Sequence, residues 1–237
     1  MDTSTTHPHP EPAGQTPTGS PQRIEFFFDP LCPWCWITSR WVLEVAEQRP
    51  LEVTWRLISL AVLNGGTDSE PARTAYQPMI RTGTEIMRVL AATRELGNDQ
   101  LGELYTCLGI RIHDKGRGSE LFGPDATEDL HLELLSESLV AAGLPAELLE
   151  ASGNPAYDAS VRSETTEALA RTGDDVGTPI ITFDPDNPEQ TSFFGPVLNR
   201  IPRGDEAVEL FDLVGKLVTT PGLSEIKRSL RGAPEFG

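Results

Sequence analysis

The 237-residue sequence has few cysteines, few basic residues and no long apolar run, and each shortage excludes a class of protein. Three cysteines are too few, and odd in number, for a disulfide scaffold, so we expect a cytoplasmic rather than an oxidising location. With 19 Lys and Arg against 36 Asp and Glu, the net charge of −17 repels phosphate backbones and anionic lipids, which argues against nucleic-acid and membrane partners. The longest mostly apolar run, Leu57–Leu63, is far shorter than the roughly 20 residues that span a bilayer.

Both ends of the sequence lack the apolar residues that a packed core needs. Residues 1–22 contain five prolines, five threonines and only Met1 and Ala13 as apolar residues, so we expect a disordered tail. It has neither the basic nor the apolar region of a secretory signal peptide. We interpret His7 and His9 as solvated tail residues, because further metal ligands are not nearby in the sequence. Residues 226–237, which contain glycine and proline, are expected to form a C-terminal tail.

The first 66 residues carry the pattern of a strand, a helix and a second strand. Ile24–Phe28 is a β-prone run that ends at Asp29-Pro30. Apolar residues then recur every four positions, at Ile37, Trp41 and Val45, as on a helix. The next run, Leu51–Leu57, alternates apolar and polar residues, which indicates a strand.

Helical periodicity continues from Glu70 to about Thr172. Near the start of this stretch, a predicted helix face comprises Ile86, Val89, Leu90, Thr93 and Leu96. A second predicted face comprises Leu132, Leu135 and Leu139. Leu144-Pro145 is expected to open a further helix, and residues 157–170 also have a helical pattern.

Strand patterns return after the helices. Pro179–Phe183 and Thr191–Phe194 are joined by a turn-rich stretch, residues 184–190, which predicts a hairpin. A last amphipathic helix has its apolar face at Ala207, Leu210, Val214, Leu217 and Val218. The order β-α-β, helical block, β-β-α predicts an α/β domain formed by residues 23–66 and 173–225, with residues 67–172 as an all-helical insertion. The two halves of the sheet would bring Pro179 close to the first strand.

Two cysteines, Cys32 and Cys35, stand where the first strand meets the first helix, with Pro33 at a position that suits the first turn of a helix. A helix N-terminus and C-x-x-C spacing lower the pKa of a thiol from about 8.5 to roughly 3.5–7.5. Cys32 is placed for that effect, whereas Cys35 lies one turn inside the helix and can attack a mixed disulfide at Cys32. We therefore predict that Cys32 is the nucleophile and Cys35 the resolving thiol.

A zinc site is the main alternative for this cysteine pair. Cys107 and His113 could complete four ligands, but the sequence has no second C-x-x-C pair, and a strand-to-helix turn favours redox chemistry. We expect no bound metal, and we interpret Cys107 as a small buried residue. Because no G-x-G-x-x-G fingerprint follows a strand, a tightly bound flavin or nicotinamide is not indicated either.

Four segments together resemble a known family. They are D-P-L-C-P-W-C-W-I-T-S-R-W at 29–41, R-I-H at 111–113, G-T-P at 177–179 and F-F-G-P-V-L-x-R-I-P-R-G at 193–204. They resemble the actinobacterial mycothiol-dependent nitroreductase family, within the DsbA/FrnE-like thioredoxin-fold oxidoreductases. The resemblance covers almost all of the chain after the tail, and it implies a thioredoxin fold around the helical insertion. The proline-rich tail and the long 184–190 loop depart from the family pattern.

The resemblance also implies roles for individual residues. The peptide bond between Thr178 and Pro179 is expected to be cis, and Thr178 would present its backbone to a substrate linked to the thiol. Pro33 and Trp34 flank the thiols, and Trp34 could stack on a flat aromatic substrate. For Trp36, packing in the core is as well supported as stacking on a substrate. His113 is either a substrate contact or a residue that caps and hydrogen-bonds within the fold.

The implied function is a thiol-dependent oxidoreductase. Mycothiol, a low-molecular-weight thiol co-substrate, would supply electrons through Cys32 to a nitroaromatic or similar electrophile. The alternative is a DsbA-like protein-disulfide oxidoreductase or isomerase. Proteins with a C-x-x-C pair have redox potentials from about −270 to −120 mV, and the sequence does not tell where in this range the pair lies. A third class, the glutathione-transferase kappa and hydroxychromene-carboxylate isomerase relatives, carries serine where Cys32 stands. The expected partners are small molecules, and a homodimer stays open.

Overall fold

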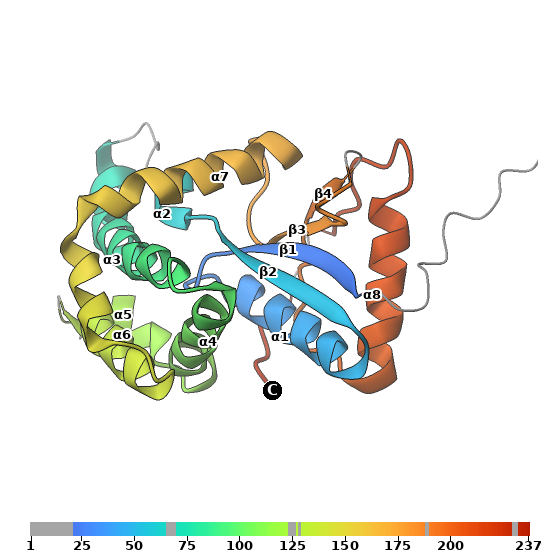
Figure 1. Cartoon of the computed structure of the whole chain (residues 1–237). Coiled ribbons are helices and arrows are strands. Elements are labelled where there is room, and N and C mark those ends of the chain that lie inside the picture. Colours follow the sequence, from blue (N-terminus) through green and yellow to red (C-terminus); the bar gives the residue numbers. More distant parts are fainter. Residues whose placement is uncertain (1–20, 65–69, 123–126, 128, 188–189, 229–231) are drawn as a thin grey trace, which may run out of the picture.

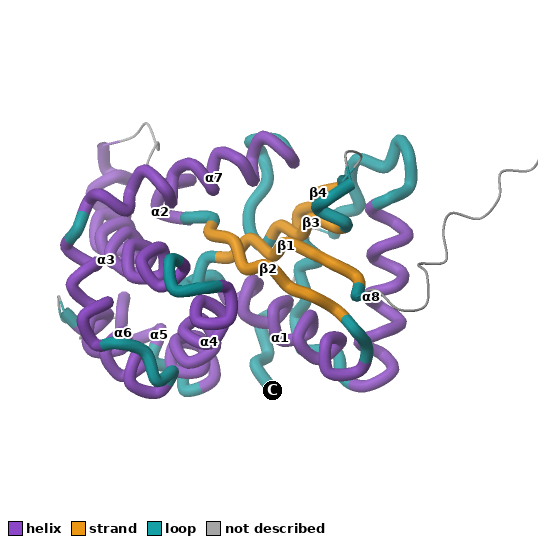
Figure 2. Tube along the Cα trace, viewed as in Figure 1, coloured by secondary structure: helices purple, strands orange, loops and turns teal. Residues whose placement is uncertain are grey.

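The computed structural model describes residues 21–64, 70–122, 127, 129–187, 190–228 and 232–237 (Figure 1). Nearly all of the predicted N-terminal tail, with His7 and His9, lies outside the described residues. Gln22 already belongs to the sheet, because it is the first residue of the first strand and pairs with Leu51. The described chain is mixed α/β, with the sheet at its centre and helices on both sides (Figure 2).

A four-stranded sheet with the order β2-β1-β3-β4 holds the molecule together. The strands are β1 (Gln22–Phe28), β2 (Leu51–Leu57), β3 (Ile180–Phe183) and β4 (Thr191–Phe194). β1 pairs in parallel with β2 and antiparallel with β3, and β3 and β4 form the predicted antiparallel hairpin. β1 is an inner strand, and because Phe26, Phe27 and Phe28 are all fully buried, both of its faces are covered.

Two helices complete the thioredoxin half of the molecule, which comprises these four strands, α1 (Pro33–Gln48) and α8 (Gly204–Val218). The predicted face of α1 is confirmed, since Ile37, Trp41 and Val45 are fully buried. Trp41 joins the two helices, because its Nε1 donates a hydrogen bond to the carbonyl oxygen of Ala207, at 2.9 Å.

The predicted face of α8 is partly wrong. Ala207 and Val218 are buried as expected, but Leu217 is 45% exposed. Phe211, which the pattern left out, is buried, and its ring centroid lies 5.5 Å from both Trp41 and Phe183. A large aromatic side chain that fills the space between α1 and the sheet therefore determines how this helix is rotated.

The helical insertion between β2 and β3 gathers beside one end of the sheet (Figure 1), and it begins with a helix at Leu60, before the predicted boundary at residue 67. Its elements are α2 (Leu60–Asn64), α3 (Glu70–Arg94), α4 (Asn98–Gly109), the π-helix η1 (Ile110–Asp114), α5 (Gly118–Phe122), α6 (Leu130–Ala141), the 3₁₀ helices η2 (Ala146–Gly153) and η3 (Pro155–Tyr157), and α7 (Asp158–Thr172). The helix predicted after Pro145 is therefore a 3₁₀ helix. The predicted α3 face is buried from Ile86 to Thr93, but Leu96 is 49% exposed because α3 ends at Arg94.

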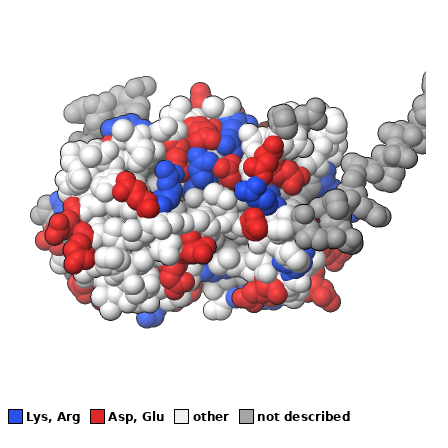
Figure 3. Space-filling model, viewed as in Figure 1, with Lys and Arg blue, Asp and Glu red and all other residues white. Residues whose placement is uncertain are grey.

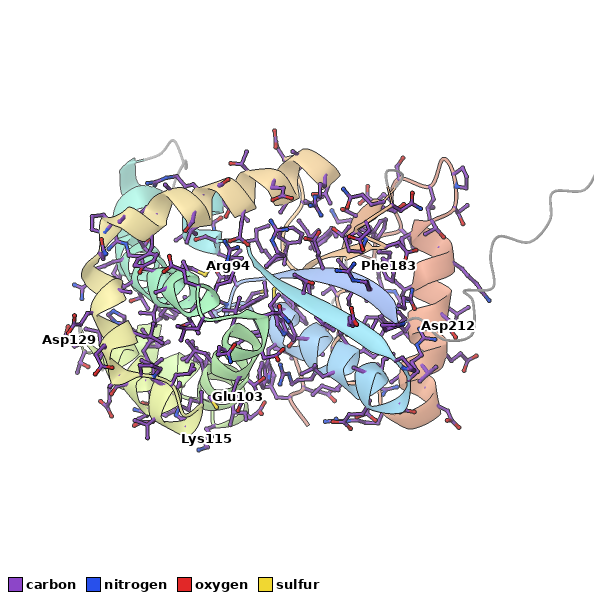
Figure 4. All side chains as sticks on the ribbon, in the orientation of Figure 1. Arg94, Glu103, Lys115, Asp129, Phe183 and Asp212 are labelled. Atoms are coloured by element: carbon purple, nitrogen blue, oxygen red, sulfur yellow. The ribbon has the colours of Figure 1, made fainter. Side chains whose placement is uncertain are left out.

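Ion pairs and edge capping join the insertion to the sheet. Arg56 on β2 pairs with Glu25 on β1 and with Glu164 and Glu167 on α7. Arg94, labelled in Figure 4 below α7, also pairs with Glu164. Figure 3 shows basic and acidic side chains intermingled at the centre of the face of the molecule that Figure 1 presents. Charges on both elements would be left unpaired if α7 moved away from the sheet, so these contacts fix the insertion against it.

The outer edge of β2, which pairs with no other strand in the described sheet, is also covered by the insertion. The side chain of Asn98, at the start of α4, accepts from the backbone N–H of Trp55 at 2.8 Å and donates to the carbonyl of Val53 at 2.9 Å. This amide therefore satisfies backbone groups that an additional strand would otherwise pair with.

Candidate active site

The cysteine turn connects the end of β1 to the start of α1. Cys32 is the N-cap residue of α1, with extended backbone angles (φ −82°, ψ 113°), and Pro33 follows in the first turn. The Sγ atom of Cys32 accepts from the backbone N–H of Cys35 at 3.4 Å. Proline is suited to this position because its missing N–H would have no partner in the first turn of the helix. The turn thus places Cys32 Sγ at the helix entrance, where the sequence predicted it.

The surroundings of Cys32 favour its thiolate. Only 4% of the residue is exposed. Hydrogen bonding from the Cys35 thiol is the largest cause that lowers the pKa of Cys32, burial opposes it, and the Thr178 hydroxyl and the Cys35 N–H lower the pKa further. The negative charge of Asp29 acts in the opposite direction. Side-chain donors from two segments therefore supplement the backbone of the helix entrance in stabilising the anion.

Cys35 has the opposite tendency. It is fully buried, and burial raises its pKa well above the ordinary value for a cysteine, with Cys32 raising it further. Both cysteines are free thiols in this structure. The proton is therefore held more tightly by Cys35 than by Cys32, and this order of the two pKa values agrees with the sequence prediction.

Thr178 and Pro179 face the cysteine turn from the segment before β3. The peptide bond between them is cis, as the resemblance implies. The carbonyl oxygen of Thr178 lies 3.9 Å from Cys32 Sγ, and Thr178 is buried. The pairing of β3 with β1 produces this contact across 146 positions of sequence. The predicted approach of the two halves is thus present.

Asp29 is a buried residue beside the cysteines to which the sequence analysis assigned no role. It is 1% exposed, and its two carboxylate oxygens each accept one backbone N–H at 2.8 Å, from Leu31 and from Leu60. Burial raises its pKa from 3.8 to about 6, although both hydrogen bonds act to lower it. Asp29 therefore ties the cysteine turn to the start of α2 and brings a titratable carboxylate next to the thiols.

The two tryptophans of the motif have different surroundings. Trp36 is 1% exposed, and its Nε1 donates to Asp114 Oδ1 at 2.7 Å. The Arg40 guanidinium lies 4.0 Å from the centre of its ring. These contacts support the core-packing interpretation of Trp36. Trp34 is only partly buried, at the edge of the core next to the cysteines.

His113 lies at the end of η1, within the insertion, and packs against the cysteine turn. Its Nε2 is 2.9 Å from the carbonyl oxygen of Pro30, and its ring stacks on Trp36 with centroids 5.8 Å apart. Because Pro30 can only accept there, Nε2 carries the proton. Burial lowers the pKa of His113 from 6.5 to about 4, so the imidazole is neutral at pH 7. The insertion thus contributes a neutral donor that holds the turn carrying Cys32.

The geometry does not assemble the zinc site considered above. Among the residues that the structure describes, no group of three or more His, Cys, Asp or Glu side chains could hold a metal ion. Cys107 is buried on α4, where its Sγ lies 3.6 Å from Glu103 Oε1. The predicted small buried role of Cys107 agrees with this position.

Tyr105 and Arg40 are further residues near the site that sequence reasoning missed. Tyr105 is fully buried and its ring stacks on Phe28, with centroids 3.9 Å apart. The Arg40 guanidinium lies 5.7 Å from the same ring and donates to Thr106 Oγ1 at 3.0 Å. Tyr105 belongs to no recognisable motif. Arg40 stands in the quoted 29–41 segment, one helical turn after Trp36 on the same face of α1, but the sequence assigned it no role.

A Cys-x-x-C turn between a strand and a helix, facing a cis-proline in a four-stranded mixed sheet, defines a thioredoxin-fold oxidoreductase of the thiol–disulfide type. The family model described as "Mycothiol-dependent nitroreductase Rv2466c" matches residues 31–228. The chain therefore belongs to this Rv2466c-like family, as the sequence resemblance predicted.

Two individual proteins illustrate the similarity. The chain is 27% identical over 206 residues to the Mycobacterium tuberculosis protein named "Uncharacterized protein Rv2286c", covering 86% of this chain and 81% of that protein. Its structure is similar to that of the cytosolic disulfide reductase DsbM from Pseudomonas aeruginosa, with a TM-score of 0.50, 15% identity, and coverage of 82% of this chain and 99% of that chain. At that identity the structural similarity shows the fold alone.

Proposed function

We propose that the protein reduces nitroaromatic or similar electrophilic small molecules with electrons from mycothiol, and that Cys32 is the reacting thiol. The observation that carries this proposal is the state of Cys32, which combines a lowered pKa with 4% exposure. A reactive but buried thiolate suits small reactants better than folded proteins. Membership of the mycothiol-dependent nitroreductase family supports the choice of thiol and substrate.

The proposed reaction has an oxidative half in which the protein gives two electrons. The Cys32 thiolate and the Cys35 thiol become a disulfide, and two electrons and the Cys35 proton pass to the substrate, together with a second proton from water. A nitro group that accepts them becomes a nitroso group and releases one water. The lowered pKa of Cys32 and the raised pKa of Cys35 support Cys32 as the attacking anion and Cys35 as the source of one proton.

Mycothiol restores the dithiol in the second half. One mycothiol thiolate attacks Cys32 Sγ of the disulfide, which forms a mixed disulfide and leaves Cys35 reduced. A second mycothiol then attacks the mixed disulfide, releasing mycothiol disulfide and the Cys32 thiolate. Two mycothiol molecules are thus oxidised for each nitro group reduced to nitroso. If Cys35 attacks the mixed disulfide first, mycothiol leaves and the ring closes again.

The residues around Cys32 have separate proposed roles in binding. Thr178, whose carbonyl faces Cys32 Sγ, would hold a thiol-linked substrate through its backbone, with Pro179 fixing that backbone. Pro33 and Trp34 would form the partly exposed side on which a flat molecule lies. His113 would act from the insertion, through its contact with Pro30 and as a pocket group.

The helical insertion is proposed as a lid over the cysteine end of the sheet. Besides His113, it brings Gly83 of α3 against the turn, where a side chain on that glycine would meet Leu31 at 3.6 Å. Within the described residues no helix is long and apolar enough to cross a membrane.

A cytoplasmic location, where small thiols are kept reduced, remains part of the proposal.

One experiment separates this function from protein-disulfide exchange. Purified reduced and oxidised protein is incubated with mycothiol, other small thiols, and reduced or scrambled protein substrates, and adducts at Cys32 are mapped by mass spectrometry. A mycothiol adduct at Cys32, with nitroaromatic turnover that consumes two mycothiols for each two-electron reduction, is expected. Efficient adducts with folded proteins and none with mycothiol would assign the protein to disulfide exchange instead.

A further inference from the structure

The C-terminal residues 232–237, which we call the C-terminal clasp, lie against both halves of the molecule. The backbone N–H of Glu235 donates to the carbonyl oxygen of Asn199, at 2.7 Å. At Gly232 the backbone comes so near this loop that a Cβ atom there would lie 2.1 Å from Nδ2 of Asn199. In Figure 1 the C-terminus lies between α4 and α1. The clasp follows the last residue matched by the family model, Arg228.

The other contact of the clasp is with the insertion. The ring of Phe236 is 5.4 Å from the ring of His113, at an interplanar angle of 39°, and Phe236 packs on the edge of the main core. His113 in turn holds the carbonyl of Pro30, two residues before Cys32. One aromatic residue of the clasp thus touches the histidine that holds the cysteine turn.

These contacts form a continuous series that begins at α1 and returns to the cysteine turn just before it. The loop that carries Asn199 is itself fixed to α1, because the Thr38 hydroxyl donates to the carbonyl of Pro196 at 2.9 Å. The loop contacts Glu235 of the clasp, Phe236 of the clasp contacts His113, and His113 contacts the cysteine turn. Without the clasp, the loop after β4 and the insertion would lose the contacts that it makes between them.

We propose that Phe236 is a positioning residue that acts through His113: the clasp holds the insertion against the thioredoxin half and thereby limits the size of the molecule that reaches Cys32. The proposal rests on the proposed role of Cys32 as the reacting thiol, but not on mycothiol or on nitro reduction. It predicts that loosening the clasp opens Cys32 to bulky reagents more than to small ones. A role limited to global stability would not discriminate between reagents by size.

The test measures alkylation rates at Cys32 by peptide mass spectrometry, with iodoacetamide as the small reagent and N-(1-pyrenyl)maleimide as the bulky one. Phe236→Ala removes the aromatic contact, and Phe236→Tyr keeps the ring. Phe122→Ala is the matched control, since Phe122 is 40% exposed on α5. An aromatic pair contributes about 0.5–1.5 kcal/mol, so its loss should raise the bulky-to-small rate ratio by about 2- to 12-fold.

We expect this increase in Phe236→Ala, and wild-type ratios in Phe236→Tyr and Phe122→Ala. Equal ratios in all four proteins would overturn the proposal, as would equal increases in Phe236→Ala and Phe122→Ala. Circular dichroism of each variant shows whether it is folded. If Phe236→Ala is not, Phe236→Leu removes the ring while keeping an apolar side chain, and the same increase is required of it. Because alkylation needs no mycothiol, the size discrimination can be measured even if the nitroreductase assay fails, so the two proposals are tested separately.

Discussion

Asp29 offers the sharpest test of the electrostatics beside the thiols. Its pKa is raised from 3.8 to about 6 by burial, which corresponds to about 3 kcal/mol at roughly 1.4 kcal/mol per pKa unit. Since the folded state holds the proton more tightly than the unfolded chain, folding stability falls as the pH rises from about 4 to about 6. Above pH 7 the carboxylate is ionised in both states, and its effect on the free energy of unfolding is constant.

The perturbation is Asp29→Asn, which removes the titration. Asparagine has one acceptor oxygen where aspartate has two, so either Leu31 or Leu60 loses the acceptor of its N–H. That loss costs roughly 1–3 kcal/mol at every pH. The free energy of unfolding of the wild type minus that of the variant should therefore fall by about 3 kcal/mol between pH 4 and pH 7, on top of a constant offset.

His113 makes the comparison with the variant essential. Its pKa is lowered from 6.5 to about 4, so it stabilises the fold above pH 6.5, and that stabilisation is lost as the pH falls towards 4. This contribution, also about 3 kcal/mol, has the opposite slope to that of Asp29 and nearly cancels it in the wild type. The free energy of unfolding of Asp29→Asn alone should therefore rise clearly from pH 4 to pH 6.5.

The assay is guanidinium unfolding of the reduced proteins at half-unit pH steps from 4 to 8, with the m-values compared at each pH. Asp212→Asn, at a half-exposed carboxylate on α8 labelled in Figure 4, reports the effect of the same substitution at the surface. A wild-type-minus-variant difference that is flat or rises between pH 4 and pH 7 would refute the reasoning. In the same preparations, alkylation should show a lower pKa for Cys32 in Asp29→Asn, because the opposing negative charge is gone.

Three further predictions concern the thiols and the insertion. Cys35→Ala should raise the alkylation pKa of Cys32 more than Cys35→Ser does, because serine keeps a side-chain donor; equal values would contradict the proposed hydrogen bond. Cys32→Ser should abolish mycothiol-dependent turnover while Cys35→Ser retains a fraction of it at saturating mycothiol, whereas equal losses would favour a strict dithiol mechanism. Hydrogen exchange in residues 70–122 and 129–172 should differ between the reduced, oxidised and mycothiol-bound proteins, and identical protection in all three would contradict the lid.

The sequence predicted the site through local signals. A β-prone run, a C-x-x-C turn and a helical period of four fix where Cys32 lies, because each depends on residues close together in the chain. The order of the strands before and after the helical block then implied that Pro179 approaches Cys32. The contact of Thr178 with Cys32 Sγ shows that this topological argument was sufficient.

Groups that depend on tertiary burial could not be predicted in the same way. Asp29 stands in the quoted motif, but its raised pKa results from burial in the folded protein, and the hydrogen bond from Leu60 acts in the opposite direction. Phe236 stands in a stretch with the composition of a tail, and the role proposed for it rests on its contact with His113. The rotation of α8 was wrong for a related reason, since a hydrophobic pattern does not tell which apolar side chain, Phe211 or Leu217, fills the available space.

The burial of Cys32 has a consequence for the choice between small thiols and proteins. If the insertion is the proposed lid, a folded protein disulfide reaches Sγ only after the insertion separates from the cysteine turn, which breaks the Asp29–Leu60 and His113–Pro30 hydrogen bonds. Breaking one bond to a charged group and one between neutral groups costs about 2–4.5 kcal/mol together. This corresponds to roughly 30- to 2000-fold fewer molecules open to a protein partner at any moment. A small thiol that enters without breaking both bonds would avoid that factor, so the proposed lid and the proposed low-molecular-weight reductant support each other.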